Sequence, residues 1–522
     1  MSFCLMARFT MFVMKTKPTE EDTTMRRYLY TVLAVVMVFT IVVPAFAQAP
    51  VPPNEAPLDV YKWDYPESFG DVTIAVVGDA GHNLKPYEFW KEDLAKVGIT
   101  TEIIEVPFDS VYEKEMAEFV VGSGAFDLVT FYPAYIGDFA GNGFLEPLDE
   151  YMAKEPALVW DPMAEDVLPP FWELYCKFGG KAYALPIDGD ILMLQYRRDL
   201  FENADEQAAF KEKYGRDLVP PETWDDWLQV GEFFTRKKGE MLAGETLEHD
   251  FYGVAEYGMR GFSAYWYLNR FTSAGGMYFD ADMNPTINTP EGVAGLQNMV
   301  DSLKVAPPDT LAYGYEELKD AFLKGYVAMI MQWSDVPKKS GDPELSTIVG
   351  KVGVGLVPGT KMADGTVKHS AMMPVGRVLA VAADSENKDA AYWVAKHLSY
   401  DRSLDDVSTM LTGLDPYRYS HFSNPQAYAM FADEATAQAY LKGVEDNMAV
   451  GFPEIFIPGS AAYTDALDLQ VQKALTGEVT PEEALANAAA EWDKITDKLG
   501  RENQVKLWQQ ALESYKALGL TK

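Results

Sequence analysis

From Asp71 onward, short strand patterns alternate with helical patterns, and no other feature of the sequence restricts the possible folds as strongly. The segments DVTIAVVG, TTEIIEVP and FDLVTFY are rich in β-branched residues and predict strands, whereas PYEFWKEDLAKVG and SVYEKEMAEFVVGSG predict helices between them. This alternation is typical of an α/β fold with a mainly parallel sheet. The ligand crevice of such a sheet lies at the carboxyl ends of its strands, here at Asp79 and at Tyr132.

The N-terminal residues carry an export signal. A basic start at 25–27 precedes an apolar stretch at 29–43 and a small-residue cleavage motif at 45–47, which is the pattern of a secretory signal peptide. The apolar stretch is shorter than the roughly 20 residues that span a bilayer, although an uncleaved anchor remains an alternative. We therefore expect an over-called start at 1–24, a signal peptide at 25–47 and a proline-rich linker at 48–70.

Length, charge and cysteine content restrict the class of protein. The 522 residues are 48% hydrophobic, which is enough for at least two folded units. A formal net charge of −35 leaves no basic stripe for phosphate groups, so we expect neither nucleic acid nor an anionic membrane surface as a partner. Cys4 lies in the leader, so Cys176 is the one cysteine of the mature chain and no intramolecular disulfide can form.

The sequence lacks the motifs of common enzymes and metal sites. Its five histidines stand singly, and it has no HExxH, Cys-x-x-Cys, G-x-S-x-G or GxxxxGK[ST] motif. We therefore predict no metal, no cofactor and no enzymatic activity. One alternative remains open: Asp188 and Asp190 share one face of a strand and could serve as the carboxylate pair of a secreted glycoside hydrolase.

The same two aspartates, with Gly189 between them, interrupt two apolar strand patterns in the segment FGGKAYALPIDGDILMLQYRRDLFE. A continuous apolar run would pack better in a buried sheet. A charged pair at this position is more typical of a turn or a hinge, where glycine gives the backbone freedom to change direction.

Several segments, taken in order, resemble a known family. They are GDAGHN, FDLVTFYPAYIGDFAGNGFLEPLDEYM, FGGKAYALPIDGDILMLQYRRDLF, PPETWDDW, FLKGYVAMIMQWSD, VGVGLVPG, ENKDAAYWVAKHLS and TGEVTPEEALANAAAEWDKI. Together they run from about Asp71 to the C-terminus and are similar to the extracellular solute-binding proteins of family 1, which bind sugars for ABC importers. The resemblance implies a type II periplasmic-binding-protein-like α/β fold, with two discontinuous lobes, a hinge and a ligand cleft between the lobes.

The resemblance also implies boundaries and a function. The implied lobes are residues 71–187 with 376–415, and residues 188–375 with 416–522. The chain would be the substrate-binding component of an ABC importer, capturing an oligosaccharide, sugar or polyol and delivering it to the permease subunits in the membrane. We expect it to be exported, either to the periplasm or to the extracellular side of the cytoplasmic membrane, and to act as a monomer. The same fold with a non-sugar solute, such as a polyamine, remains an alternative because several aspartates face the implied cleft.

The implied site combines two kinds of side chain. Sugars have hydroxyl rims and apolar C–H faces, so their sites pair hydrogen-bonding groups with flat aromatic rings. By the match to the family, Asp190 is expected to accept hydrogen bonds from the ligand and Trp333 to stack on it, while Ile187 and Gly189 form the hinge. The full set of predicted ligand-binding residues is Asp79, Phe131, Tyr132, Tyr135, Asp188, Asp190, Tyr265, Trp333, Arg377, Arg418 and Tyr463.

Overall fold

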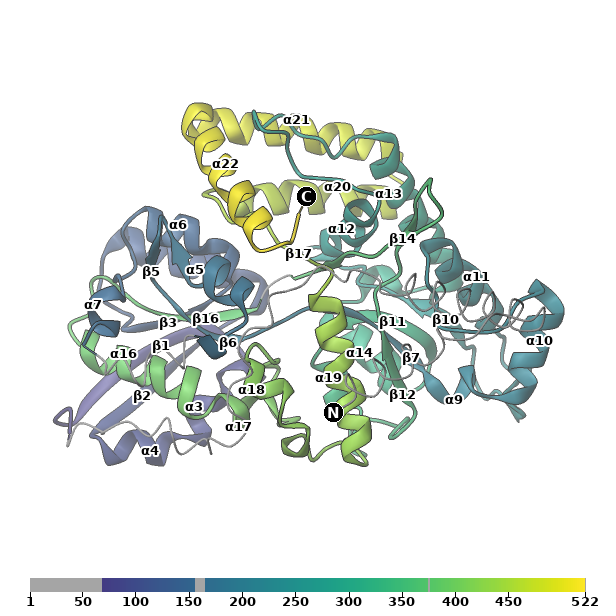
Figure 1. Cartoon of the computed structure of the whole chain (residues 1–522), viewed down its shortest axis with the longest axis horizontal. Coiled ribbons are helices and arrows are strands. Elements are labelled where there is room, and N and C mark those ends of the chain that lie inside the picture. The colour runs from purple at the N-terminus through teal and green to yellow at the C-terminus, as the bar shows by residue number, and fades with distance from the viewer. Residues whose placement is uncertain (1–67, 155–164, 374–375, 522) are drawn as a thin grey trace, which may run out of the picture. The chain divides into compact units, whose positions relative to one another are not determined.

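Two β-sheets organise the part of the chain that the computed structural model describes, namely residues 68–154, 165–373 and 376–521 (Figure 1). These residues belong to one compact unit, Ala56–Lys522. The predicted start and signal peptide, and the linker up to residue 67, lie outside the described residues. Among the described helices, none has the length and apolar character needed to cross a membrane.

The first sheet has five strands in the order β2-β1-β3-β16-β6. Their bounds are β1 Val72–Asp79, β2 Ile99–Val106, β3 Leu128–Phe131, β6 Leu185–Asp188 and β16 Arg377–Val381. Strand β1 pairs in parallel with β2 and β3, as the alternation of strands and helices predicts. Strand β16 returns from much later in the sequence and pairs antiparallel with both β3 and β6.

The second sheet has four strands in the order β10-β11-β7-β12. Their bounds are β7 Leu192–Arg197, β10 Tyr252–Ala255, β11 Val327–Trp333 and β12 Val352–Gly355. All four strands come from the sequence between β6 and β16, so the chain leaves the first sheet, builds the second and returns. This discontinuous arrangement confirms the predicted two-lobe α/β fold class, while the exact lobe boundaries remain a prediction.

Helices cover both sheets and form a separate layer at the C-terminal end (Figure 1). Those of the first half are α3 Lys85–Phe89, α4 Lys91–Lys96, α5 Val111–Val121, α6 Ile136–Gly141, α7 Asp149–Met152, α9 Arg198–Phe201, α10 Ala204–Tyr214, α11 Trp224–Phe234 and α12 Ser263–Ser273. Those of the second half are α13 Pro290–Ser302, α14 Tyr315–Leu323, α15 Val336–Lys339, α16 Lys388–Lys396, α17 Ser403–Val407, α18 Tyr419–Phe422, α19 Glu434–Met448, α20 Ser460–Leu475, α21 Pro481–Leu499 and α22 Arg501–Ala517. Short two-residue strands complete the fold: β4 Lys177–Phe178, β5 Lys181–Ala182, β8 Met241–Leu242, β9 Glu245–Thr246, β13 Thr360–Lys361, β14 Val367–Lys368, β15 Ala371–Met372 and β17 Gly451–Phe452.

Local sequence explains where the longer helices begin. Helix α11 starts after Thr223, whose hydroxyl accepts from the Asp226 N–H while the Asp226 carboxylate accepts from the Thr223 N–H. Helix α21 starts in the same way with Thr480 and Glu483. Such reciprocal capping satisfies backbone donors that the first helical turn leaves unpaired.

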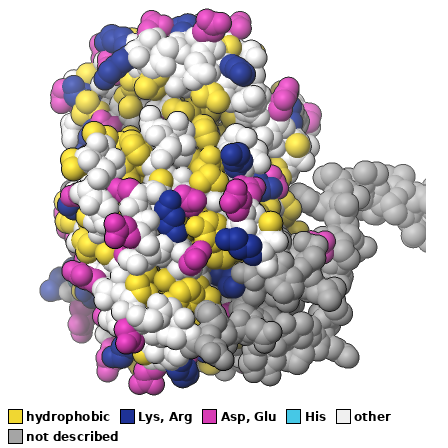
Figure 2. Space-filling view, turned by 90° about the vertical axis from the view of Figure 1, so that its left-hand side faces the viewer, with side chains coloured by type: hydrophobic (Ala, Val, Ile, Leu, Met, Phe, Trp, Pro, Cys, Tyr) yellow, Lys and Arg dark blue, Asp and Glu magenta, His cyan; other side chains and the backbone are white. Residues whose placement is uncertain are grey.

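Charged side chains of both signs lie on the face of the molecule that Figure 2 presents. Acidic and basic side chains are interspersed there among apolar and uncharged ones (Figure 2). A nucleic-acid surface would instead gather basic side chains in one stripe.

Candidate functional site

Two described segments that pass between the sheets meet in one place. One follows β6, and the other joins α17 to α18 through residues 408–418. The Asp415 N–H donates to Oδ1 of Asp188 over 2.7 Å, and the Gly189 N–H donates to the Asp415 carbonyl over 3.1 Å. Arg377, the first residue of β16, is the register partner of Asp188. We call these residues, with Asp190, the crossover junction.

Glycine is required at the centre of the junction. A Cβ atom at Gly189 would lie 2.3 Å from the carbonyl oxygen of Pro416, which is backbone and cannot rotate away. We expect Gly189→Ala to lower the free energy of unfolding by about 1–3 kcal/mol, the usual effect of overpacking. The control is Gly355→Ala, because a Cβ there meets only Leu194 at an ordinary 3.5 Å. Urea unfolding measures the free energy of unfolding of both variants. Equally small losses in the two would contradict the close approach of Gly189 to the Pro416 carbonyl.

Arg377 holds the junction together electrostatically. Its guanidinium is buried and donates twice to Asp79, from Nε over 2.8 Å and from Nη2 over 3.0 Å. Its Nη1 lies 3.6 Å from Asp190 Oδ2 and 3.8 Å from Asp188 Oδ2. Burial opposes ionisation of Asp79, but Arg377 outweighs it and holds the pKa of that carboxyl below its ordinary value.

Three carboxyl groups crowd the other side of the junction. One oxygen from each of Asp188, Asp190 and Asp415 lies within 4.8 Å of the others, and all three side chains are buried. Burial and the neighbouring Asp415 raise the pKa of Asp188 to about 8, and burial with Asp188 raises the pKa of Asp190 well above its ordinary value. Lys338 Nζ lies 3.2 Å from Asp415. The group has the donor atoms for a cation, but Lys338 and Arg377 already provide positive charge beside it.

Aromatic rings from both sheets surround these charges. Tyr132 and Phe108 follow β3 and β2, and their ring centroids lie 4.5 and 5.6 Å from the Arg377 guanidinium. Phe108 contacts Phe262 at 4.7 Å, and Phe262 lies 6.3 Å from Trp333 at the end of β11. Because these side chains follow strand ends, the site lies where the sequence predicts a ligand crevice.

Comparison with known proteins identifies the family. A sequence profile of the bacterial extracellular solute-binding proteins matches residues 81–399. The chain belongs to this family. The predicted recognition and its general function, solute binding, are therefore confirmed.

Solved structures show the same fold for this solute-binding protein. Maltose-bound MalE3 from T. maritima is 25% identical with a TM-score of 0.65, over 81% of this chain and 99% of that chain. A ribitol complex of an ABC transporter solute-binding protein from Agrobacterium radiobacter K84 is 24% identical with a TM-score of 0.66, over 82% of this chain and 100% of that chain.

Curated relatives differ in the solute that their names give. The mannitol-binding protein of Pseudomonas aeruginosa is 26% identical, over 70% of this chain and 79% of its own length. A probable amino-acid ABC transporter periplasmic-binding protein of Sinorhizobium fredii is 24% identical, over 72% of this chain and 80% of its own length. The ligand of this solute-binding protein must therefore be argued from its own side chains.

The structure brings most of the predicted ligand-binding residues together. Asp79, Asp188, Asp190 and Arg377 form one buried network with Tyr132 above it, and Trp333 lies in the surrounding rings. The Tyr265 ring lies 6.0 Å from Phe262, and its hydroxyl donates to Glu454. Tyr135 lies 5.4 Å from Tyr132. Their contacts with a ligand remain predictions.

Three other predicted residues have different surroundings. Phe131 is buried in β3 and packs on Phe139 at 5.1 Å. Arg418 stacks on Tyr400 at 4.0 Å and pairs with Asp166 at 3.4 Å. Tyr463 packs on Phe279 and Trp492 in the C-terminal helical layer, and its hydroxyl contacts Thr496. None of these contacts joins the crossover junction, and the predicted ligand roles of the three residues remain untested.

The structure adds residues that sequence reasoning missed. Glu115 on α5 is fully buried, and neither of its carboxyl oxygens has a hydrogen-bond partner among the described residues. Burial and the nearby Asp79 raise its pKa well above the ordinary value. A signal was present: Val111, Glu115 and Phe119 stand four residues apart, so the acid occupies the apolar face of the helix. Asp335 also has one unpartnered oxygen, while its other oxygen accepts from Tyr315 and Lys339.

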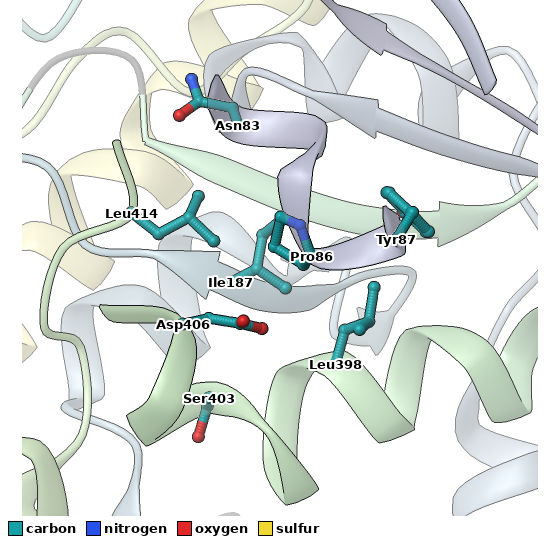
Figure 3. Close-up of a pocket in the computed structure, with 8 residues that line it drawn as sticks. All are labelled: Asn83, Pro86, Tyr87, Ile187, Leu398, Ser403, Asp406 and Leu414. Carbon is teal, nitrogen blue, oxygen red and sulfur yellow. The ribbon is translucent and has the colours of Figure 1, made fainter. Parts of the chain in front are cut away.

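A small pocket lies next to the junction residue Asp188, at the preceding residue Ile187. Ile187, the predicted hinge residue, lines it together with Leu398, Leu414 and Asp406 (Figure 3). Trp90 Nε1 donates to Asp406 over 2.9 Å, but burial dominates and raises the pKa of Asp406 to about 8. The carboxyl group at this site is therefore protonated in the folded chain at neutral pH.

Asp406 should make stability depend on pH. The pKa of Asp406 in the folded chain is about 8, above the ordinary 3.8. The protonated carboxyl group therefore contributes fully to the free energy of unfolding below about pH 4. As the pH rises from there to about 8, this free energy falls by about 1.4 kcal/mol per pH unit. Asp406→Asn keeps an acceptor for Trp90 and cannot ionise. We expect urea unfolding to show that the free energy of unfolding of the variant rises relative to that of the wild type as the pH goes from 6 to 8. Asp405→Asn, at a 57% exposed neighbouring side chain, is the control. If the difference in free energy of unfolding between Asp406→Asn and the wild type is the same at pH 6 and pH 8, the carboxyl group is not a buried neutral one.

Proposed function

We propose that this chain is the substrate-binding component of an ABC importer, and that it captures a sugar, oligosaccharide or polyol between its two lobes. In this proposal it acts as a periplasmic monomer, makes and breaks no bond, and passes the solute to permease subunits in the membrane. The observation that carries the proposal is the placement of aromatic rings from both sheets around buried carboxyl oxygens that lack hydrogen-bond partners.

The chemistry of these groups supports a ligand rich in hydroxyl groups. The unpartnered atoms near the junction include the Asn83 Oδ1, Asp188 Oδ2 and Asp335 Oδ1 oxygens and both oxygens of Glu115. A buried acceptor without a partner costs about 1–3 kcal/mol, and hydroxyl donors of a ligand would remove that cost. The faces of Trp333 and Phe262 would receive apolar C–H groups of the same molecule.

Entry of a ligand requires the lobes to separate, because the rings of Phe108 and Phe262 already touch. In the proposed mechanism Ile187 and Gly189 act as a hinge, and the lobes close again around the ligand. Affinity then comes from burying the ligand against both lobes. Because the ligand stabilises the closed form, the permease recognises the loaded protein by its closed lobes.

A thermal-shift panel tests the proposal. The purified mature protein is heated with single monosaccharides, oligosaccharides, polyols, amino acids and polyamines. A ligand at a hundred times its dissociation constant adds about 2.7 kcal/mol to the free energy of unfolding, and small-angle scattering should show a smaller radius of gyration. The bound solute should be recovered unchanged by chromatography. Stabilisation by amino acids or polyamines alone, or the appearance of hydrolysis products, would overturn the proposal.

A further inference from the structure

We propose that the ligand is an amino sugar or an amino polyol, whose ammonium group binds at the crossover junction between Asp188, Asp190 and the surrounding aromatic rings. This inference rests on the proposed function and narrows it from any hydroxyl-rich solute to a cationic one.

The first argument is a surplus of buried acid. Among the described residues around the junction, the buried acids are Asp79, Glu115, Asp188, Asp190, Asp335 and Asp415, and the buried bases are Arg377, Lys338 and Lys339. Each base has an acid of its own: Arg377 pairs with Asp79, Lys339 with Asp335 and Lys338 with Asp415. Asp188 and Asp190 share Arg377 with Asp79, at 3.8 and 3.6 Å, and Glu115 pairs with no cation among the described residues, so six acids have three bases between them.

The other titratable groups nearby do not supply the missing charge. Burial and Lys339 lower the pKa of His82 to about 4, so its ring is neutral. Glu454 adds a further acid, which accepts from the Tyr265 hydroxyl. Without a ligand, the surplus acids are neutralised by protons, which agrees with the raised pKa of Glu115, Asp188 and Asp190.

The second argument is independent of charge and concerns hydrogen bonds. Within the part of the chain that the structure describes, Asp188 Oδ2 has no hydrogen-bond partner although the side chain is fully buried, and the same holds for both oxygens of Glu115 on a different element. An ammonium group carries three donors and no acceptor. It would satisfy such oxygens and balance their charge at once, whereas a hydroxyl group satisfies them but leaves the charge to be neutralised by protons.

The third argument is the aromatic surroundings. The rings of Tyr132 and Phe108 already lie against the Arg377 cation, and Phe262 packs on both rings. Trp333 lies 6.3 Å from Phe262 and 6.0 Å from Tyr315. Aromatic faces attract desolvated cations by about 2 kcal/mol. Carboxylates framed by rings are therefore suited to an ammonium group on a hydroxylated carbon chain.

A divalent cation would also balance the charge of Asp188, Asp190 and Asp415. However, Lys338 lies 3.2 Å from Asp415 and Arg377 lies 3.6 Å from Asp190, so two fixed positive charges already stand beside these carboxyl groups and oppose a doubly charged ion. A ligand ammonium can share carboxylate oxygens with these side chains because each oxygen accepts more than one hydrogen bond.

Matched ligand pairs test the inference by calorimetry at pH 7.5. Glucosamine is compared with glucose and with uncharged N-acetylglucosamine, and 1-amino-1-deoxysorbitol is compared with sorbitol. We expect the amino compound to bind at least tenfold more tightly than its neutral partner in at least one pair. Binding should release protons, seen as a dependence of the measured heat on the ionisation enthalpy of the buffer, because the ammonium replaces protons on the acids.

Variants locate the effect. Asp190→Asn and Glu115→Gln should each reduce the ratio of amino to neutral affinity at least threefold, and either one suffices if the other does not fold. Asp406→Asn, a buried acid outside the junction, should leave the ratio unchanged. Calcium chloride alone is the last arm, and stabilisation by calcium that amino ligands do not reproduce would overturn the inference.

The outcomes separate the inference from the function beneath it. If neutral sugars or polyols bind as tightly as their amino partners, the inference fails and the proposed function stands. If no hydroxylated compound binds, while spermidine or an amino acid does, the proposed function fails together with the inference.

Discussion

Replacement of Arg377 by methionine is expected to lower the free energy of unfolding by about 3–5 kcal/mol, the usual result of removing one partner from a buried ion pair. The change leaves Asp79 buried without its two charge-assisted hydrogen bonds, and it removes the cation nearest to Asp188 and Asp190. Urea unfolding measures the loss. A double variant, Arg377→Met with Asp79→Leu, should recover most of it, because replacing both partners of a buried pair by apolar groups is often neutral.

The same variant should lower the affinity for a neutral sugar or polyol at least a hundredfold, since it removes the cation that holds the carboxyl network of the proposed site. Arg418→Met is the matched comparison, because Arg418 is equally buried but contacts Tyr400 and Asp166. We expect it to reduce stability and to change affinity by less than about threefold. Loss of affinity in Arg418→Met would support the sequence-based ligand role of that residue, and unchanged affinity in Arg377→Met would contradict the proposed site.

The sequence was sufficient for the individual strands and helices because their signals are local, whereas the two-lobe arrangement was predicted only through the resemblance to the family. The run Val72–Asp79 has the β-branched pattern of a buried strand, and Thr223 and Thr480 mark helix starts through chemistry that spans three residues. The antiparallel return of β16 between β3 and β6 is not local. It pairs residues about 190 to 250 positions apart, and no periodicity within the strand specifies its partner.

Matching residue types to the family selected Asp79, Asp190 and Trp333, which the structure places around one junction, while their contacts with a ligand stay predictions. The site was not predictable where the deciding fact is a distance between elements. Asp415 joins Asp188 through a backbone donor, and Phe262 meets Phe108 from the other sheet. Conversely, Tyr463 has the residue type of a stacking platform, but its ring packs on Trp492 and Phe279 inside a helical layer.

Replacement of Trp333 by leucine should weaken ligand binding about tenfold to a hundredfold, because it removes the largest ring beside the junction and the stacking surface it offers. The indole packs edge to face on Trp266 at 5.3 Å and on Phe262 at 6.3 Å, and Tyr315 lies at 6.0 Å. The change also leaves a cavity, so we expect a loss of about 2–4 kcal/mol in the free energy of unfolding. Calorimetry and urea unfolding measure the two effects separately.

Trp492→Leu supplies the control that distinguishes stacking from general loosening of the fold. Trp492 is fully buried, its Nε1 donates to the Tyr463 carbonyl over 2.7 Å, and its ring contacts Phe279 rather than the junction. Its replacement should destabilise the chain at least as much as Trp333→Leu and change affinity by less than about threefold at a temperature where both variants are folded. If the two variants lose affinity in proportion to their loss of stability, Trp333 acts through packing alone. If only Trp333→Leu loses affinity, and Trp333→Phe restores part of it, the ring itself contacts the ligand.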